Sequence, residues 1–191
     1  GGGRSAGSRL MTLRGSGLVL LACAIAPAIA QAATPECAVW QRELSFAQSV
    51  QKHDAAAFAG HVMADAVFDA NTPQPTRGRA AILQHWAPMI EGRTVHLDWY
   101  PQQVVVSGDG TLAYSSGAYL FENAAPGAKR RYTIGRFATT WRRAADGVWR
   151  AAFDGGDEGR PASAADADAF RAGRVTSCPR SDIAALPVIR H

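Results

Sequence analysis

The hydrophobic period of this chain changes once, at Glu91-Gly92, and this change limits the folds open to it. Before it, apolar residues recur at helical spacing; after it, apolar and polar residues alternate as in β-strands. Helices followed by an antiparallel run of strands give an α+β order, in which the helices must cover one face of one sheet. We therefore expect a curved antiparallel sheet covered by three N-terminal helices, forming a cone with a cavity inside.

Three helices are expected before the change in period. The first begins at Thr34-Pro35-Glu36, which supplies an N-cap, a proline at the first helical position and an acid in the first turn, and it runs to about Lys52. Asp54 caps a shorter second helix. The third helix runs from Arg79 to about Ile90.

Four strands are expected after the change, joined as a meander by turns that contain glycine with aspartate, asparagine or proline. Their approximate ranges are 95–106, 111–122, 131–143 and 148–154. Pro101 interrupts the first of these strands, so we expect a bend or bulge there.

The stretch 65–86 links the two halves of the chain. A short apolar strand, Ala66 to Phe68, brings Asp69 to its end, and a proline-bearing loop leads from there to Gly78 and the third helix. This order places an acid at the mouth of the cavity. Asp69 is a candidate general base if burial raises its pKa; alternatively, its side chain accepts hydrogen bonds within the turn.

The first 32 residues differ in composition from the rest. Residues 1–10 are rich in glycine and serine and precede Met11, so we expect them to be translated upstream sequence or the result of a mis-set start. Residues 11–32 combine an early arginine, an apolar run and small residues, which is typical of a secretory signal peptide. The run is too short for a convincing membrane span. We therefore expect export to the periplasm or beyond; the alternative is a lipoprotein anchored at Cys23.

The positive charge of the chain does not indicate a nucleic-acid partner. Its formal net charge is +4, but Arg4, Arg9 and Arg14 lie in the N-terminal segment, so the remainder carries +1. A polyanion would find no concentrated basic surface on it. We expect no nucleic-acid binding.

Two cysteines remain after removal of the signal peptide. In an oxidising compartment Cys37 and Cys178 are expected to form a disulfide, which would pin the C-terminal tail across the domain. Two free thiols or an intermolecular bridge are the alternatives. The expected domain covers 34–157, and 158–191 is its tail, with a short helix near 162–174 that docks through Phe170.

No metal-ligand spacing, phosphate loop or nucleophile elbow occurs in the sequence. We therefore expect neither a metal nor an organic cofactor.

The order of the elements is accompanied by three segments that carry a resemblance: DAVFDANTPQPTRGRAAI, VHLDWYPQQVVVSGDGTLAYSSGAYLF and GRFATTWRRAADGVWRAAFDGG. Over about Glu36 to Gly156 the chain resembles the NTF2-like superfamily and, more narrowly, its SnoaL-like and DUF4440 proteins. The resemblance implies a cone-shaped α+β barrel with a pocket for a small molecule. It also implies a homodimer formed through the outer face of the sheet.

Ketosteroid isomerases belong to the same superfamily, and only part of their machinery carries over. They have a general-base aspartate nine positions before the loop glycine, and Asp69 and Gly78 have this spacing. Their two oxyanion donors correspond to Phe46 and Gly135, neither of which can donate through a side chain. Because an isomerase must stabilise a developing enolate, steroid isomerase activity is not expected.

His85 stands where the related enzymes have a pocket phenylalanine, so we expect it to face the cavity and form an acid/base couple with Asp69. The alternative is a hydrogen-bonded histidine at the edge of the core. The other pocket-lining candidates are large aromatic residues and one carboxylate: Phe46, Trp86, Trp99, Tyr114, Phe137, Trp149 and Asp154. Most of the aromatic residues are expected to be core because they are large and apolar, with one or two lining the pocket, and Asp154 could instead cap a turn.

Two functions remain open. The first is cofactor-independent acid/base chemistry of isomerase, lyase or hydrolase type on a small apolar molecule, with Asp69 and His85 as the catalytic residues. The second is a non-catalytic module for ligand binding or dimerisation. A strongly raised pKa at Asp69 or His85 inside a closed cavity would favour the enzyme, whereas a shallow cavity filled by tryptophan and phenylalanine would favour the module.

Overall fold

The computed structural model describes residues 1–3 and 34–179. The expected signal peptide, Cys23 and the end of the tail lie outside the described residues. Within the described part, no helix is long and apolar enough to cross a membrane.

Helices and strands follow the order expected from the sequence, including the short helix near 162–174, and two short strands that were not expected are added at 76–77 and 160–162. The helices are α1 (Pro35–Gln51), α2 (Ala55–His61), α3 (Arg79–Glu91) and α4 (Ala164–Ala172). Thr34 and Asp54 cap the first two helices, because their side chains accept hydrogen bonds from backbone amides in the first turn. Gly92 ends α3 in the left-handed conformation, with φ of 61°.

The strands form one curved and unclosed sheet. They are β1 (Val62–Phe68), β2 (Thr76–Arg77), β3 (Val95–Val106), β4 (Leu112–Asn123), β5 (Tyr132–Arg143), β6 (Trp149–Gly156) and β7 (Arg160–Ala162). Their order across the sheet is β2-β1-β6-β5-β4-β3, and β7 pairs with β5. The register of β3 on β4 shifts between Pro101 and Gln103, at the position where the proline predicts a bulge.

One pairing differs from the expected antiparallel sheet, which is in fact mixed. β1 lies parallel to β6, with Phe68 opposite Asp154. The whole of α3 and the meander separate these strands in sequence, so the chain has room for the long connection that a parallel pair requires. As a result, β1 and β6 end side by side, and Asp69 lies next to Asp154.

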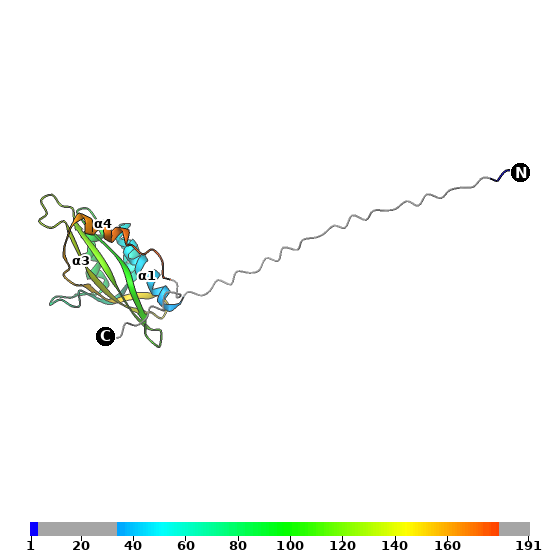
Figure 1. The fold of residues 1–191 in the computed structure, drawn as a ribbon. Helices are drawn as coiled ribbons and strands as arrows, with labels where there is room; N and C mark the ends of the chain where they lie inside the picture. Colours follow the sequence, from blue (N-terminus) through cyan, green and yellow to red (C-terminus); the bar gives the residue numbers. More distant parts are fainter. Residues whose placement is uncertain (4–33, 180–191) are drawn as a thin grey trace, which may run out of the picture. The chain divides into compact units, whose positions relative to one another are not determined.

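The main core lies between the inner face of the sheet and α1 to α3. Phe46 is at its centre, fully buried, with ring centroids 5.0 Å from Phe58, 5.3 Å from Trp99 and 6.0 Å from Trp141. α4 packs on the sheet through a second cluster, in which the ring of Phe170 packs against that of Tyr100 at an angle of 42°, with their centroids 4.9 Å apart. Figure 1 shows α4 crossing the ends of the long strands, apart from α3.

The chain beyond Gly156 is attached to the domain at several points. β7 pairs with β5, and Ser163 caps α4 through a reciprocal bond with Asp166. Cys37 and Cys178 are joined by a disulfide that spans 141 residues of sequence. The tail segment up to Cys178 is therefore tied to the first turn of α1.

Candidate functional site

A pocket of about 260 Å³ lies at the end of the sheet where β1 and β6 finish. α3 forms one wall and the inner faces of β3 to β6 form the others. Its lining residues are Asp69, His85, Trp86, Met89, Leu97, Trp99, Tyr119, Phe137, Asp154, Gly155, Gly156 and Asp157. The pocket thus has aromatic walls and several acidic groups, and it contains both members of the expected acid/base couple.

Asp69 is held by its backbone, which leaves its side chain free to face the pocket. Its N–H donates to the carbonyl of Asp154 at 2.8 Å, and its own carbonyl accepts from the N–H and the hydroxyl of Thr72 at 2.9 Å. The expected turn contacts are therefore made by the main chain. Its φ of 55° lies in the left-handed region, which costs a non-glycine residue on the order of 1 kcal/mol. Backbone strain of this kind is found more often at functional sites than elsewhere.

α3 brings His85 to the same pocket. Its Nε2 lies 3.6 Å from Oδ2 of Asp69, and the two side chains are 57% and 37% exposed. This distance is longer than a hydrogen bond, so no direct bond joins the two side chains and both can turn to a bound molecule. The exposed imidazole can pass protons between the pocket and water.

Asp154 also faces the pocket, from the end of β6. Thr139 donates its hydroxyl to Oδ1 of Asp154 at 2.6 Å. Burial raises the pKa of Asp154 well above its usual range, and the negative charges of Glu43 and Asp69 raise it further. The sequence left open whether Asp154 is a pocket carboxylate or a turn cap, and the structure places it in the pocket. A carboxyl group that keeps its proton there can donate a hydrogen bond to a bound molecule.

Glu43 lies beneath the pocket and was missed in the sequence. It is fully buried on α1 and accepts hydrogen bonds from Trp99 Nε1 at 2.7 Å, Ser115 Oγ at 2.5 Å and Trp141 Nε1 at 3.0 Å. Burial raises the pKa of Glu43, and these donors oppose that rise. Its position could have indicated burial, because Trp40, Glu43, Ala47 and Val50 follow helical spacing along the apolar side of α1.

The aromatic candidates divide into three groups. Trp86, Trp99 and Phe137 line the pocket. Phe46 and Trp149 do not: both are buried core residues, which corrects the expectation that they line it. Tyr114 is a second correction, since it is 44% exposed on the outer face of the sheet. The reason is strand alternation, because it is the neighbouring Ser115 that points inward to Glu43.

Tyr119 and Asp157 were also missed as pocket residues. A Cβ at Gly135 would lie 2.2 Å from Oδ1 of Asp157 and 2.5 Å from the ring of Tyr119. These two residues thus fill the space of a side chain at position 135, where the resemblance would place an acid. The hydroxyl of Tyr119 donates to the carbonyl of Asp157 at 2.9 Å. Burial, followed by the Asp157 charge, raises the pKa of Tyr119.

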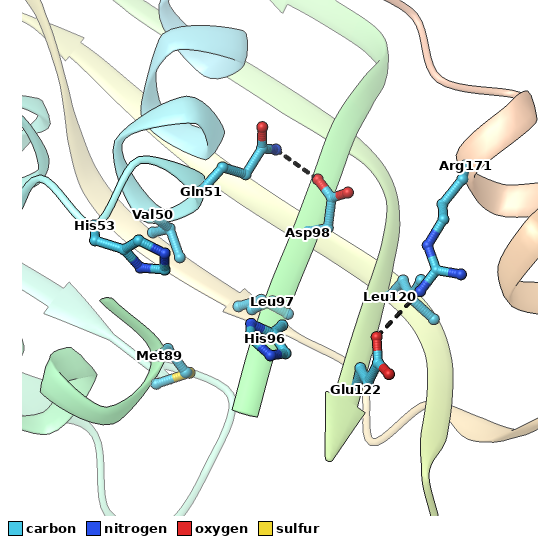
Figure 2. A pocket seen from close by; sticks show the side chains of 10 residues that line it. All are labelled: Val50, Gln51, His53, Met89, His96, Leu97, Asp98, Leu120, Glu122 and Arg171. Carbon is cyan, nitrogen blue, oxygen red and sulfur yellow. Dashed lines mark hydrogen bonds and ion pairs between the residues drawn. The ribbon is translucent and has the colours of Figure 1, made fainter. Parts of the chain in front are cut away.

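A second hollow, of about 250 Å³, lies between the ends of α1, α3 and α4 and the start of β3 (Figure 2). Figure 2 shows its two carboxylates already engaged: Asp98 accepts from Gln51 at 2.7 Å, and Glu122 accepts from Arg171 at 3.1 Å. These two carboxylates therefore attach α1 and α4 to the sheet. Among the described residues, no group of three or more histidine, cysteine, aspartate or glutamate side chains is arranged to hold a metal ion.

Comparison with known families matches residues 44–152 to the SnoaL-like domain. That segment is more than half of the chain and contains α2, α3 and most of the sheet. It includes every pocket residue except Asp154, Gly155, Gly156 and Asp157. No functionally curated protein matches the chain.

Solved structures show the same fold at low sequence identity. An NTF2-like superfamily protein from Salmonella enterica serovar Typhimurium is 18% identical, with a TM-score of 0.54, over 69% of this chain and 94% of that one. A ketosteroid isomerase-like protein from Erwinia carotovora atroseptica is 18% identical, with a TM-score of 0.51, over 65% and 96%. An NTF2-like protein of unknown function from Pseudomonas putida is 19% identical, with a TM-score of 0.51, over 68% and 94%.

Proposed function

Because the chain belongs to the SnoaL-like family of the NTF2-like superfamily, we propose that it is an exported protein that carries out acid/base chemistry in this pocket. The substrate is a small, largely apolar molecule, and the reaction is of isomerase, lyase or hydrolase type. Export rests on the signal-peptide pattern of residues 11–32. The chemistry rests on the site, because proteins of one fold perform many reactions.

The observation that carries the proposal is the convergence of Asp69, His85 and Asp154 on one pocket. Asp69 takes a proton from a carbon next to a carbonyl group, and the electron pair moves to the carbonyl oxygen. Asp154, which keeps its proton, donates a hydrogen bond to that oxygen. His85 then exchanges the abstracted proton with water or returns it to the product. Asp154 thus takes the part of the donors that Phe46 and Gly135 cannot supply.

The alternative is a non-catalytic ligand-binding or dimerisation module, and a feature of the outer sheet face favours it. Val105 pairs with Tyr114, Tyr114 with Thr140, and Thr140 with Phe153, in one row across four strands. The three apolar members of this row are 52%, 44% and 50% exposed, in chain order. Adjacent exposed apolar groups on a sheet are suited to contact with a second copy.

Exchange of carbon-bound hydrogen for solvent deuterium tests the chemistry without knowledge of the substrate. The wild-type protein is expected to label small cyclic and aryl ketones in D₂O next to the carbonyl, as followed by NMR. Asp69→Asn removes the base and is expected to lower the exchange rate by about 10²-fold or more. His96→Ala, which alters a histidine outside the pocket, should leave the rate unchanged.

The pH profile separates the role of Asp154 from that of Asp69. As the pH rises through the raised pKa of Asp154, its proton is lost and the exchange rate should fall. In Asp154→Asn this alkaline fall should disappear, because the amide donates at every pH. Equal exchange rates in wild type and Asp69→Asn across the ketone panel would instead support the non-catalytic module. Native mass spectrometry would then be expected to show a dimer or a complex with a co-purifying ligand.

A further inference from the structure

The pocket is lined by acidic groups without a strong cation. Its ionisable lining residues in the described chain are Asp69, Asp154, Asp157, His85 and Tyr119, and none is a lysine or an arginine. Arg136 lines a neighbouring hollow, which shares Phe137, Asp154 and Asp157 with the pocket, and its Nη1 donates to Gln102. No lysine or arginine side chain therefore lines the pocket itself.

The effects of this negative field can be seen on two groups that line the pocket. The charges of Glu43 and Asp69 add to burial in raising the pKa of Asp154. On the other side, the charge of Asp157 adds to burial in raising the pKa of Tyr119. Both groups thus resist ionisation in a pocket that already carries negative charge. A bound cation would relieve this repulsion, whereas a bound anion would increase it.

The walls between these acids are aromatic. Trp86 and Trp99 come from α3 and β3, and Tyr119 and Phe137 from β4 and β5. Aromatic rings attract cations through their electron-rich faces, and most strongly when water is excluded. Two of these walls, Trp86 and Trp99, are fixed by burial in the aromatic core, with centroids 6.1 Å apart. The rings are therefore in place before a ligand arrives.

We propose that the pocket selects a molecule with a positively charged nitrogen, either a protonated or a quaternary amine, on a small apolar or aromatic body. The aromatic walls contact the body and the cationic group, and Asp69 and Asp157 supply the opposing charge. This inference shares its pocket with the proposed function but concerns a ligand other than the substrate of the proposed reaction. A cation that ionises Asp154 removes the hydrogen-bond donor which that reaction needs, so it binds in competition with the substrate.

Binding of such a cation has a consequence that a neutral ligand lacks. A positive charge beside Asp154 favours the ionised form of its carboxyl group, so binding lowers the pKa of Asp154 and releases a proton. The number of protons released can be measured by titration calorimetry in two buffers with different ionisation enthalpies.

The experiment compares three ligands that share a benzyl or phenyl body: benzyltrimethylammonium, benzyl alcohol and benzoate. At pH 7 and low salt, benzyltrimethylammonium is expected to bind at least about 10-fold more tightly than benzyl alcohol, and benzoate more weakly than either. Proton release is expected for the cation alone. The affinity for the cation should fall as salt is added, because screening weakens the attraction.

Three variants assign the effect to the pocket. Asp157→Asn retains the acceptor oxygen and is expected to weaken cation binding by about 3- to 10-fold. Asp154→Asn should abolish the proton release. Asp168→Asn is the matched control, because it removes an equal charge from the exposed face of α4 and should change neither quantity.

Binding of benzoate or benzyl alcohol as tightly as the cation would overturn the proposal, and so would the absence of binding by all three. Loss of affinity in Asp168→Asn equal to that in Asp157→Asn would also overturn it, since a general surface field would then explain the preference. Because these are equilibrium measurements, a protein that binds the cation but exchanges no carbon-bound hydrogen would contradict only the acid/base function.

Discussion

The buried side chain of Glu43 joins one helix to three strands and also influences the pocket. Its carboxyl group links α1 to β3, β4 and β5 by accepting hydrogen bonds from Trp99, Ser115 and Trp141. Trp99 is also a wall of the pocket, and the charge of Glu43 acts on the pKa of Asp154. A buried acceptor that satisfies three donors therefore supports both the core and the site.

Removing this acceptor leaves the Trp99 indole N–H and the Ser115 hydroxyl without their partner, while Trp141 Nε1 keeps only its second acceptor, Ser115 Oγ at 2.9 Å. Glu43→Ala is expected to lower the free energy of unfolding by about 3–5 kcal/mol, and Glu43→Gln by about 1–2 kcal/mol, because an amide oxygen still satisfies part of the set. Urea unfolding followed by tryptophan fluorescence measures both.

Glu36→Ala is the matched control on the same helix. Glu36 is exposed in the first turn of α1, so its loss should cost no more than about 1 kcal/mol. Equal losses for Glu36→Ala and Glu43→Ala would contradict the structural role of Glu43.

At the scale of elements, α4 and the tail depend on contacts with distant parts of the chain. Arg171 pairs with Glu122 on β4, Arg174 pairs with Asp98 on β3, and Phe170 packs on Tyr100. The disulfide between Cys37 and Cys178 then ties the end of this segment to α1. A helix of this length would be marginal alone, so these contacts stabilise it.

The disulfide closes a loop of 141 residues, so its removal should lower the stability of the whole domain. The double variant Cys37→Ser, Cys178→Ser is expected to lose about 2–4 kcal/mol of unfolding free energy, because the unfolded chain regains conformational freedom. Urea unfolding of the oxidised protein and of the variant measures the difference.

Wild-type protein in reductant should match the double variant, which makes it the internal control. Alkylation of the non-reduced protein, followed by intact mass, should modify neither cysteine. Two alkylated thiols, or a dimer that dissociates on reduction, would show that the bridge is absent or intermolecular.

At the scale of the whole molecule, stability depends on buried groups that respond to pH in opposite directions. Burial, aided by Arg42, lowers the pKa of His61 to about 4 in the folded protein. His61 contacts Ser45 at 2.8 Å and the carbonyl of Ala57 at 2.7 Å, so its role is structural. Glu43 and Asp154 have raised pKa values, so their contribution to stability falls as the pH rises through those values.

The contribution of His61 follows from the difference between its folded pKa of about 4 and its ordinary value of about 6.5. Above pH 6.5 the contribution is fully present. As the pH falls from about 6.5 to about 4, the unfolded chain binds a proton that the folded protein resists, and on the order of 2–3 kcal/mol is lost. Urea unfolding at a series of pH values should show this slope in wild type.

His61→Gln has no proton to gain, so the difference in unfolding free energy between wild type and variant should shrink as the pH falls through this window. A difference that stays constant from pH 7 to pH 4 would contradict the lowered pKa. Comparison with the variant removes the opposing effects of Glu43 and Asp154, since both proteins retain them.

Local patterns in the sequence were sufficient for the type and bounds of most elements. The ends of β3 at Val95 and Val106 and the caps at Thr34 and Asp54 all follow from hydrophobic period and capping chemistry, which involve near neighbours in the chain. The spacing of Asp69 from Gly78 likewise indicated where the loop would place an acid.

The sequence by itself thus determined most of the elements, their order and the family, because periodicity, caps and turns act over a few residues. The short strands β2 and β7, which exist only through pairing with other strands, were not among them. Only the tertiary structure decided that β1 lies parallel to β6, that Ser115 rather than Tyr114 points inward, and that Glu43 and Asp157 stand close to the pocket. These facts depend on strand register, where a shift of one residue reverses the face of every side chain. Register is set by contacts between residues far apart in the chain, which no local pattern contains.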